Sequence, residues 1–446
     1  MFPISLLPKR RGPGGEPGST RSLFFNRAWI GGAAIVLVVG VATGATALSL
    51  LALLVLVTAG LGAGWNRWAL VGVEYRRELS ADRAFPGDEV TLTITVVNRK
   101  PLPLPWLAIE DELAEALQPL DRETTMSGTT GRRVLRIVTN VRPFERVTWR
   151  VPVRCPARGL QTLGPATLRA ADPFGFFASR LTFEVWGAVL VYPRLIPLPE
   201  LGFPPRLALG ETRVVRHLLS DPSRVVGVRD YRPDDPFRAI HWKATARQGT
   251  LQVRIAEPTT TLQLAIFVNL DTFEHYWEGL DVATAERTIE VAASVAAWAS
   301  GQRYAVGVYA NGVVAGSDQA LRVPPGRGPA QLPRVLEGLA KISPYSTVAF
   351  GRTLRAGSTR LPWGSTVVVV TSLLPEGLLA QMAALLAGGY RVVLVTVGEV
   401  DVPMVRGLVV RRVEGVAKVG ADAGGGATGD RAAVASPEVE TPVSPG

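Results

Sequence analysis

One short stretch of the chain concentrates the side chains that could take part in chemistry. Between Val228 and Arg254 the sequence reads VRDYRPDDPFRAIHWKATARQGTLQVR, in a protein otherwise rich in Ala, Val, Leu and Gly. Its acids, cations and aromatic rings are Arg229, Asp230, Tyr231, Arg232, Asp234, Asp235, Arg238, His241, Trp242, Lys243 and Arg247. This composition fits a catalytic site, a docking surface for another protein, or a structural latch.

A catalytic site in this stretch would rest on His241 with Asp234 or Asp235, because a histidine beside a carboxylate can act as a general base. The sequence shows no nucleophile with a matched base, no phosphate-binding glycine loop with a lysine and no paired-carboxylate pattern. These gaps favour a role other than catalysis.

A polar network is the alternative that we favour. Arg229 and Arg238 can each pair bidentately with a neighbouring carboxylate, namely that of Asp230, Asp234 or Asp235. Tyr231 and Trp242 can pack their rings while their polar ends bond to the backbone. We therefore expect a latch that also forms a docking surface.

Nucleic-acid binding is the third possibility. Several cations lie close to Trp242, which could stack on a base, and the formal net charge of the chain is +10. Three aspartates are interleaved with these cations, however, and they would repel phosphates. We expect no nucleic-acid partner.

The N-terminal region predicts a membrane anchor. No charged residue lies between Arg27 and Arg67. One membrane-spanning helix needs about 20 apolar residues, with about 17 as the lower limit, so this run is just long enough for two short spans. The pattern predicts helices over Trp29–Ala45 and Leu48–Gly64, with interfacial tryptophans at Trp29, Trp65 and Trp68.

The flanking charges predict the topology of this hairpin, residues 28–66. A cleaved signal peptide has an apolar core of about 7–15 residues, far shorter than this run. A single tilted span would leave everything after Arg67 outside, but Arg67, Arg76 and Arg77 follow the run, and residues 1–27 before it are also basic. Positive flanks on both sides favour a multi-pass protein of the inner (cytoplasmic) membrane with cytosolic soluble domains. Residues 1–27 are expected to be disordered.

Residues 71–198 show a period of two. Glu89–Val97 alternates apolar and polar residues almost perfectly, and further strands are predicted at Arg133–Thr139, Arg146–Val153, Ala166–Ala171 and Ala188–Tyr192. Short strands separated by Gly/Pro turns favour a β-sandwich that serves as a spacer or interaction module. The single cysteine, Cys155, excludes an intrachain disulfide. A Pro-rich linker begins at Pro193, within the end of this region. Residues 199–260 hold the rest of the linker and the polar stretch described above.

Residues 261–419 predict an α/β domain. Leu262–Leu270 is a continuous apolar strand of the kind buried in parallel sheets. Strands and helices then alternate at Thr284–Ala299, Tyr304–Ala310, Ala330–Lys341, Thr366–Thr371, Glu376–Leu386 and Arg391–Val397. This alternation predicts a parallel sheet with right-handed crossovers. Residues 420–446 lack periodicity and are expected to be a disordered tail.

The polar stretch resembles the signature of the bacterial domain of unknown function 58 family. That signature runs roughly Arg-x-Tyr-x-x-Gly/Asp-Asp-x-x-Arg-x-Ile-x-Trp-x-x-Ser/Thr-Ala-Arg. It appears here as Arg229, Tyr231, Asp234, Asp235, Arg238, Ile240, Trp242, Thr245, Ala246 and Arg247. Residues 158–165 and 172–177 are similar to the upstream motif of the family. An acidic-aromatic pair usually precedes the signature, whereas Ser223–Gly227 contains no acid.

The resemblance implies an architecture and a partner. Such proteins typically carry a von Willebrand factor A-like domain after the signature and are often associated with MoxR-type AAA+ ATPases, which are thought to act like chaperones. We therefore expect a membrane-anchored, non-enzymatic interaction or scaffold protein in complex or envelope assembly. The alternative is a membrane-anchored enzyme, such as a hydrolase, that acts through residues 229–247.

A von Willebrand factor A fold can hold Mg²⁺ through an Asp-x-Ser-x-Ser motif, because Mg²⁺ prefers oxygen ligands. The corresponding residues here are Asp271-Thr272-Phe273-Glu274-His275, so both serines are replaced. The strand that might add a second acid continues Thr371-Ser372-Leu373-Leu374 and has none. We expect no metal and no cofactor, and predict that Asp271, the one candidate ligand, caps the following turn or helix.

Overall fold

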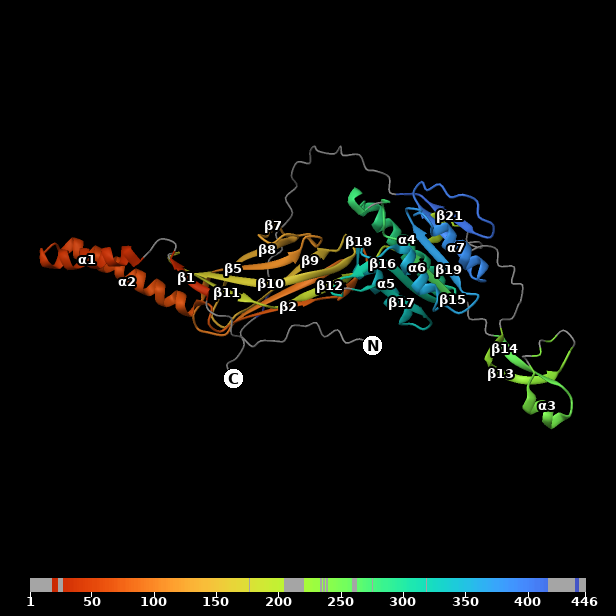
Figure 1. Cartoon of the computed structure of the whole chain (residues 1–446). Coiled ribbons are helices and arrows are strands. Elements are labelled where there is room, and N and C mark those ends of the chain that lie inside the picture. Colours follow the sequence, from red (N-terminus) through yellow and green to blue (C-terminus); the bar gives the residue numbers. More distant parts are fainter. Residues whose placement is uncertain are drawn as a thin grey trace. The chain divides into compact units, whose positions relative to one another are not determined.

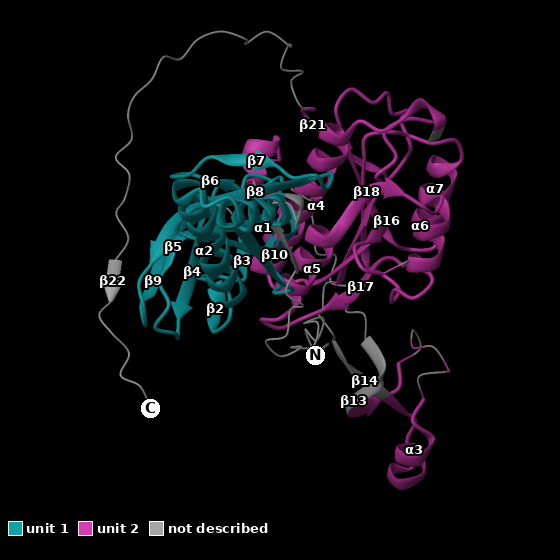
Figure 2. Ribbon diagram, turned by 90° about the vertical axis from the view of Figure 1, so that its left-hand side faces the viewer, with its two compact units in different colours: residues 1–192, 421–446 teal, residues 193–420 magenta. Residues whose placement is uncertain are grey.

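The computed structural model of the chain describes residues 18–22, 27–175, 177–203, 220–232, 235, 237, 240–258, 263–274, 276–317, 319–415 and 438–440. Two compact units make up the chain (Figure 2). The first comprises residues 1–192 with 421–446, and the second comprises residues 193–420.

Two apolar helices lie near the N-terminal end of the first unit, as the sequence predicts. Helix α1 is Arg27–Ala42 and helix α2 is Thr46–Ala69, and the two pack against each other (Figure 1). Helix α2 is long and apolar enough to cross a membrane, whereas the apolar part of α1, Trp29–Ala42, is shorter. Helix α2 continues past the predicted end at Gly64, because its last turns pack on protein rather than ending in a loop.

Two sheets follow, antiparallel except where β12 and β3 of the larger sheet pair in parallel, and we call them together the β domain. The larger sheet has the order β1 (Gly18–Ser22), β11 (Phe177–Phe183), β10 (Gly159–Ala171), β5 (Leu104–Ala114), β8 (Arg132–Val141) and β7 (Thr124–Met126), with β12 (Gly187–Val191) on β10 and β3 (Arg83–Ala84) on β12. The smaller sheet has the order β2 (Val73–Leu79), β4 (Glu89–Asn98), β9 (Arg146–Arg154) and β22 (Glu438–Glu440), with β6 (Gln118–Pro119) on β9.

Both sheets contribute to one hydrophobic core. On β4 the alternating residues Leu92 and Ile94 are fully buried, and Ile109 of β5 joins them from the other sheet. The predicted strands correspond to β4, β8, β9, β10 and β12. The structure differs in the two termini that were expected to be disordered, where β1 pairs with β11 and β22 pairs with β9. Composition misses such pairs because an edge strand offers unpaired backbone groups to any extended segment.

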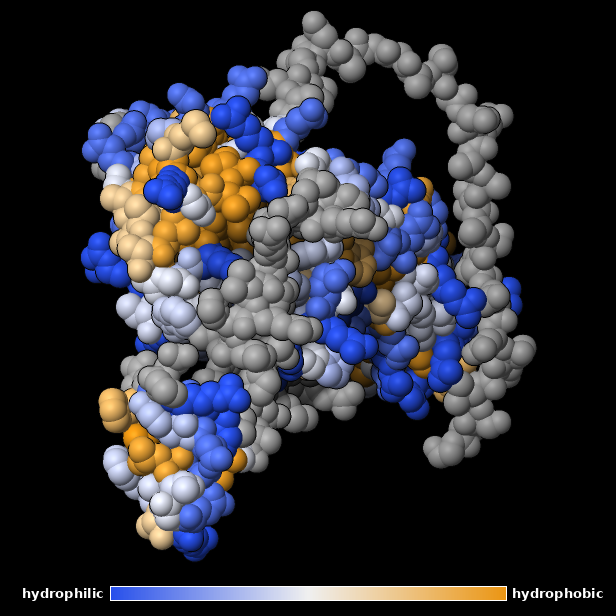
Figure 3. Space-filling view, turned by 90° about the vertical axis from the view of Figure 1, so that its right-hand side faces the viewer, coloured by the Kyte–Doolittle hydropathy of each residue, from blue (hydrophilic) through white to orange (hydrophobic). Residues whose placement is uncertain are grey.

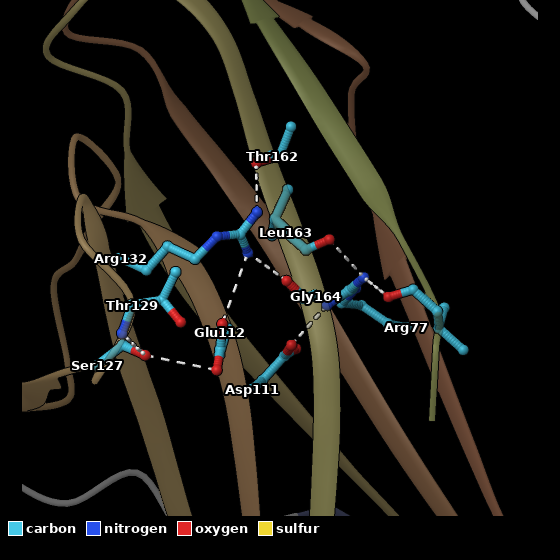
Figure 4. A network of polar contacts seen from close by, with 10 residues as sticks. Arg77, Asp111, Glu112, Ser127, Thr129, Arg132, Thr162, Leu163 and Gly164 are labelled. Atoms are coloured by element: carbon cyan, nitrogen blue, oxygen red, sulfur yellow. Dashed lines mark hydrogen bonds and ion pairs between the residues drawn. The ribbon is translucent and has the colours of Figure 1, made fainter. Parts of the chain in front are cut away.

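A buried ion pair crosses this core. Arg77 Nη1 lies 2.5 Å from Asp111 Oδ1, and the two side chains are 2% and 0% exposed. Tyr75 donates its hydroxyl to Asp111 Oδ2 at 2.7 Å. Arg77 also donates to the carbonyls of Leu163 and Val185 (Figure 4). Two buried charges are stable only when their hydrogen bonds are satisfied, and this network meets that condition.

The contacts of Thr162 and Gly164 explain part of the motif at residues 158–165, which resembles the upstream motif of the family. Arg132 donates to the carbonyl of Gly164 and to Thr162 Oγ1 (Figure 4). Gly164 has a φ of +103°, and a Cβ there would lie 2.2 Å from the Val185 carbonyl oxygen. Only glycine fits, because any side chain would clash with backbone. The motif therefore shapes the β domain.

The second unit contains a mostly parallel sheet flanked by helices. Along the chain its elements are η1 (Leu198–Leu201), β15 (Gln263–Val268), η3 (Tyr276–Glu278), α4 (Val282–Gly301), β16 (Ala305–Val314), β17 (Ala320–Gly326), α5 (Gln331–Lys341), β18 (Ile342–Ser346), α6 (Phe350–Ser358), β19 (Thr366–Thr371), α7 (Leu378–Ala387), β20 (Arg391–Val397) and β21 (Val409–Val413). The predicted alternation of strands and helices is confirmed.

The strand order positions a candidate site. It runs β17–β16–β15–β19–β20–β21, with β18 on β16; β16, β15, β19, β20 and β21 are parallel, and β17 and β18 are antiparallel to β16. The chain moves from β15 to β16 on one side and later to β19 on the other, so the order reverses at β15. Ligands of open α/β sheets bind beyond the carboxyl ends of the strands at such a reversal. Asp271 lies just past the end of β15.

The predicted linker begins inside this unit. The backbone amide of Ile196 donates to Ser294 Oγ of α4 at 2.9 Å, and η1 also contacts α4. Residues 204–209 of the predicted linker lie outside the described residues.

Candidate functional site

The signature stretch folds as a small hairpin. Strand β13 (Ser220–Asp230) pairs antiparallel with β14 (Gln252–Pro258), and helix α3 (Trp242–Gln248) lies between them in the chain. We call the described residues from 220 to 258 the signature hairpin. The strand that the sequence suggests at Ala239–Trp242 is reduced to one bridge between Ile240 and Val253. Helix α3 takes the next residues because Ala, Lys, Arg and Gln favour helix.

A bidentate ion pair closes the turn after β13. Arg229 donates from Nη1 to Asp235 Oδ2 at 2.7 Å and from Nη2 to Oδ1 at 2.6 Å. The backbone amide of Arg232 donates to Asp235 Oδ2 at 2.9 Å. These bonds hold the pKa of the Asp235 carboxyl below its usual value, with the Arg229 guanidinium as the main cause. The predicted pairing of Arg229 is thus confirmed, whereas Asp234 and Arg238 lie outside the described residues.

Other signature residues tie the hairpin together. Gln252 Nε2 donates to Asp230 Oδ1 at 2.6 Å. The Thr245 hydroxyl oxygen accepts the backbone amide of Gln252 at 3.0 Å, which links α3 to β14. Ile240 and Val253 are buried at their bridge. The signature is therefore in large part a folding pattern for this hairpin.

Of the acid–base groups considered from the sequence, His241 and Asp235 have other partners, and Asp234 lies outside the described residues. His241 is the N-cap of α3, and its Nδ1 accepts the backbone amide of Ala244 at 3.1 Å. Asp235 is bound by Arg229 and by the backbone of Arg232. Each side chain thus satisfies a structural donor.

Aromatic rings remain on the surface of the signature hairpin. Phe237 is 75% exposed and Trp242 is 66% exposed. The expected packing of Trp242 therefore does not occur, whereas Tyr231 packs against Phe237 with ring centroids 5.9 Å apart. Lys243 and Arg247 are exposed on α3. In Figure 3 the signature hairpin shows hydrophobic residues set among hydrophilic ones.

A second polar cluster lies at the carboxyl edge of the α/β sheet. Asn311 Nδ2 donates to Asp271 Oδ2 at 3.1 Å and to Asn269 Oδ1 at 3.0 Å. Asn311 Oδ1 accepts the backbone amide of Leu270 at 2.9 Å, and Asn269 Nδ2 donates to Thr371 Oγ1 at 3.1 Å. Asn269 and Asn311 are fully buried. A neutral amide thus bonds directly to the carboxylate that a metal would need.

Asp271 does not cap helix α4. Asp281 caps α4 instead, because its Oδ1 accepts the amides of Ala283 and Thr284. Burial raises the pKa of Asp271 above its usual value. Among the residues that the structure describes, no three His, Cys, Asp or Glu side chains gather as metal ligands, and His275 lies outside them.

Sequence reasoning missed both asparagines of this cluster. They lie 42 residues apart, and neither belongs to the motif that drew attention to Asp271. A signal does exist, since each follows an apolar run. FV precedes Asn269 just after β15, and VYA precedes Asn311 just after the part of β16 that pairs in parallel with β15. Polar residues at that position of an open α/β sheet face the ligand-binding edge.

Comparison with known proteins places the match on the second unit. A family model described as "Protein of unknown function DUF58" matches residues 227–414. The "Uncharacterized protein YeaD" of Bacillus subtilis (strain 168) is 26% identical over 205 residues, which are 44% of this chain and 47% of the relative. The chain therefore aligns with about half the length of this curated relative.

Solved structures show only low similarity. A cohesin module from a Clostridium perfringens family 33 glycoside hydrolase covers 27% of this chain and 96% of its own, with 10% identity and a TM-score of 0.19. The sporulation control protein Spo0M from Bacillus subtilis covers 27% of this chain and 49% of its own, with 14% identity and a TM-score of 0.16. The informative match is thus the one in sequence, in which residues 227–414, from the signature hairpin to the last strand of the α/β sheet, are similar to the DUF58 family of unknown function.

Proposed function

We propose that this protein is a membrane-anchored interaction or scaffold protein whose signature hairpin docks a MoxR-type AAA+ ATPase during complex or envelope assembly. The observation that carries the proposal is the Arg229–Asp235 clamp beside two exposed rings, Phe237 and Trp242. The choice of partner rests on the resemblance of the signature.

The chemistry of the hairpin supports docking. Interface hot spots are enriched in Trp, Tyr and Arg, and they work best on a surface that is already ordered. The Arg229–Asp235 clamp supplies that order, because it fixes the turn that carries Phe237. Asp235 and His241, on which an enzyme acting through residues 229–247 would depend, are engaged by a guanidinium and a backbone amide.

The architecture that we propose has three parts. Helices α1 and α2 form a membrane hairpin with both ends in the cytosol, supported by the cations that flank it. The β domain is a β-sandwich, supported by its two sheets around one core. The α/β domain is von Willebrand factor A-like, supported by its strand order and by the resemblance.

A fused reporter tests the topology of the membrane hairpin. A reporter that is active only in the periplasm, fused after Glu440, should be inactive; activity would contradict this topology.

Co-purification tests the docking claim. The full-length chain is expressed with a MoxR-type ATPase from the same cell, extracted in mild detergent and captured by a tag. We expect the wild-type chain to retain the ATPase and Trp242→Ala to lose it. Trp363→Ala is the matched control, since Trp363 is 65% exposed on the same unit. Retention by Trp242→Ala, or loss only with Trp363→Ala, would contradict the proposal.

A further inference from the structure

Helix α2 is built into the β domain at its C-terminal end. A Cβ on Gly62 would lie 3.0 Å from Asp172 Oδ2 and 3.1 Å from the Phe177 ring, so the helix and the β10–β11 turn are in close contact. Ser179 donates its hydroxyl to Asn66 Oδ1 at 2.7 Å. The last two turns of α2 are therefore fixed on the larger sheet.

Lys100 holds the very end of α2. Its Nζ donates to the carbonyl oxygens of Ala69 and Val71, which closes the helix C-terminus with a cation. Such a charge is favourable there, because the helix dipole is negative at its C-terminus. The loop between β4 and β5 is thereby tied to the helix end.

Three loops of the β domain meet at this end, and we call them the basal loops: residues 99–103, 142–145 and 172–175. The strand pairing places them together, since Val73, just after α2, is opposite Asn98, and Val97 is opposite Arg146. The backbone amide of Phe144 donates to the carbonyl of Lys100 at 3.3 Å, and Asn98 Nδ2 donates to the carbonyl of Arg142 at 2.9 Å. Figure 1 shows α2 meeting this end of the strands.

The basal loops combine aromatic tips with cations. Phe144 is 40% exposed and Phe174 is 49% exposed. Phe144 also has a φ of +53°, a conformation that costs energy for a bulky residue and is found where a side chain has a task. The exposed cations at this end are Arg99, Arg142 and Arg146.

The acids at this end are already engaged. Glu74 lies 2.7 Å from Arg99, the carboxylate of Glu145 accepts the backbone amide of Arg142, and buried Asp172 accepts the amides of Phe174 and Phe177. With Arg99 paired to Glu74, the cations Lys100, Arg142 and Arg146 face Glu145 and the buried Asp172, so a small net positive charge remains at this end.

The length of α2 then determines where these loops must lie. From Thr46 to Leu61, the part before the contact at Gly62, the helix rises about 24 Å. The hydrocarbon core of a bilayer is about 30 Å thick. A helix that is too short by about 6 Å draws its attached loops to the membrane surface, because its exposed apolar side chains must stay in lipid. The β10–β11 turn, which packs on Gly62, is the basal loop nearest to the lipid-exposed part of the helix.

We propose that the basal loops lie in the headgroup layer of the same membrane that holds α2. Phe144 and Phe174 reach the upper acyl chains, and Arg142 and Arg146 bind the phosphates of anionic lipids. The inference depends on the membrane anchoring in the proposed function and adds a lipid-binding surface outside the helices.

Depth measurements by spin labelling test this surface. The full-length chain is placed in nanodiscs of phosphatidylglycerol and phosphatidylethanolamine, with a label at Phe144→Cys or Phe174→Cys. Leu120→Cys and Leu160→Cys are matched controls, because these residues are 45% and 43% exposed at the opposite end of the β domain. Leu54→Cys reports on α2 itself. Cys155 is buried, and the chain without an added cysteine gives the background.

We expect the labels at 144 and 174 to be more accessible to oxygen than to a water-soluble nickel chelate, and the controls to show the reverse. In nanodiscs of phosphatidylcholine alone, the two labels should become shallower. If they match the controls while the label at 54 is deep in lipid, the proposal is overturned and the anchor stands. If the label at 54 is also exposed to water, the anchor itself is wrong.

Discussion

The guanidinium of Arg229 binds both carboxylate oxygens of Asp235, six residues further along the chain, at 2.7 and 2.6 Å. In the sequence Asp235 is a candidate carboxylate partner of His241, but in the structure it closes a turn. The substitution Asp235→Asn would therefore disturb catalysis and docking alike. Substitutions of the exposed rings separate these two roles more cleanly.

Replacement of Arg229 by lysine should open the signature hairpin while keeping the charge. Lysine is a point charge and cannot make two parallel bonds to one carboxylate. We expect faster hydrogen exchange at the amide of Arg232, which donates to Asp235. Exchange measured by mass spectrometry checks this, with Arg247→Lys on α3 as the control. Unchanged protection at residues 229–235 would show that the clamp is dispensable.

The pKa values of Asp235 and Asp271 should lie on opposite sides of 3.8, the ordinary value for an aspartate. Arg229 lowers the pKa of Asp235, so the stabilisation from this pair is complete above about pH 4 and is lost as the pH falls through the folded pKa. Burial raises the pKa of Asp271, so its ionisation destabilises the fold as the pH rises from 3.8 through the folded pKa. Carboxyl ¹³C shifts should give the lower midpoint for Asp235. Arg229→Gln should raise that midpoint and leave Asp271 unchanged; equal midpoints in the wild type would contradict both assignments.

The sequence predicted best those parts that depend on local periodicity. Strand β4 alternates strictly, and the buried strands β15, β19 and β20 are continuous apolar runs, so each was found. Helix α6 was missed because Gly351, Gly357 and Ser358 have low helix propensity, and its buried side, including Leu354, forms only in the tertiary fold. Strand β5 was missed because Pro103 and Pro105 flank its first residue, and proline is more typical of turns and loops than of strands.

The candidate sites divide in the same way. An ion pair of Arg229 with a nearby aspartate could be predicted, since opposite charges a few residues apart can meet across a turn. The choice of Asp235 rather than Asp230 depended on the turn geometry. The contact between Asn311 and Asp271 joins β16 to the loop after β15 across 40 residues and could not be predicted from local sequence.

Removal of the Asn311 side chain should weaken the α/β domain. Asn311→Ala leaves the buried amide of Leu270 without its acceptor and removes one of the donors to the Asp271 carboxylate, which keeps the one from Ser346. An unsatisfied buried group costs about 1–3 kcal/mol, so the free energy of unfolding should fall by about that amount. Denaturant unfolding in detergent measures it. Ser372→Ala, which removes one 3.3 Å bond to the Asp271 carbonyl, should cost less; an equal loss would contradict the importance of the amide.

The buried pair in the β domain should be the costliest to break. Arg77→Met leaves the Asp111 carboxylate buried beside Tyr75 without its cation. Breaking a buried pair from one side costs about 3–5 kcal/mol. The matched control is Arg154→Met, because Arg154 and Glu89 are 3.1 Å apart and half exposed, and such pairs contribute about 0–1 kcal/mol. Similar losses in the free energy of unfolding for the two variants would contradict the network.

Affinity for the ATPase is the most direct test of docking through the signature hairpin. The dissociation constant of a purified MoxR-type ATPase is measured against the full-length chain in nanodiscs, for the wild type, Trp242→Ala and Trp363→Ala. Truncation of a hot-spot aromatic costs about 2 kcal/mol or more, which corresponds to a loss of about 30-fold or more. We predict that loss for Trp242→Ala and a change of less than about threefold for Trp363→Ala. Equal affinities for the wild type and Trp242→Ala would contradict the account.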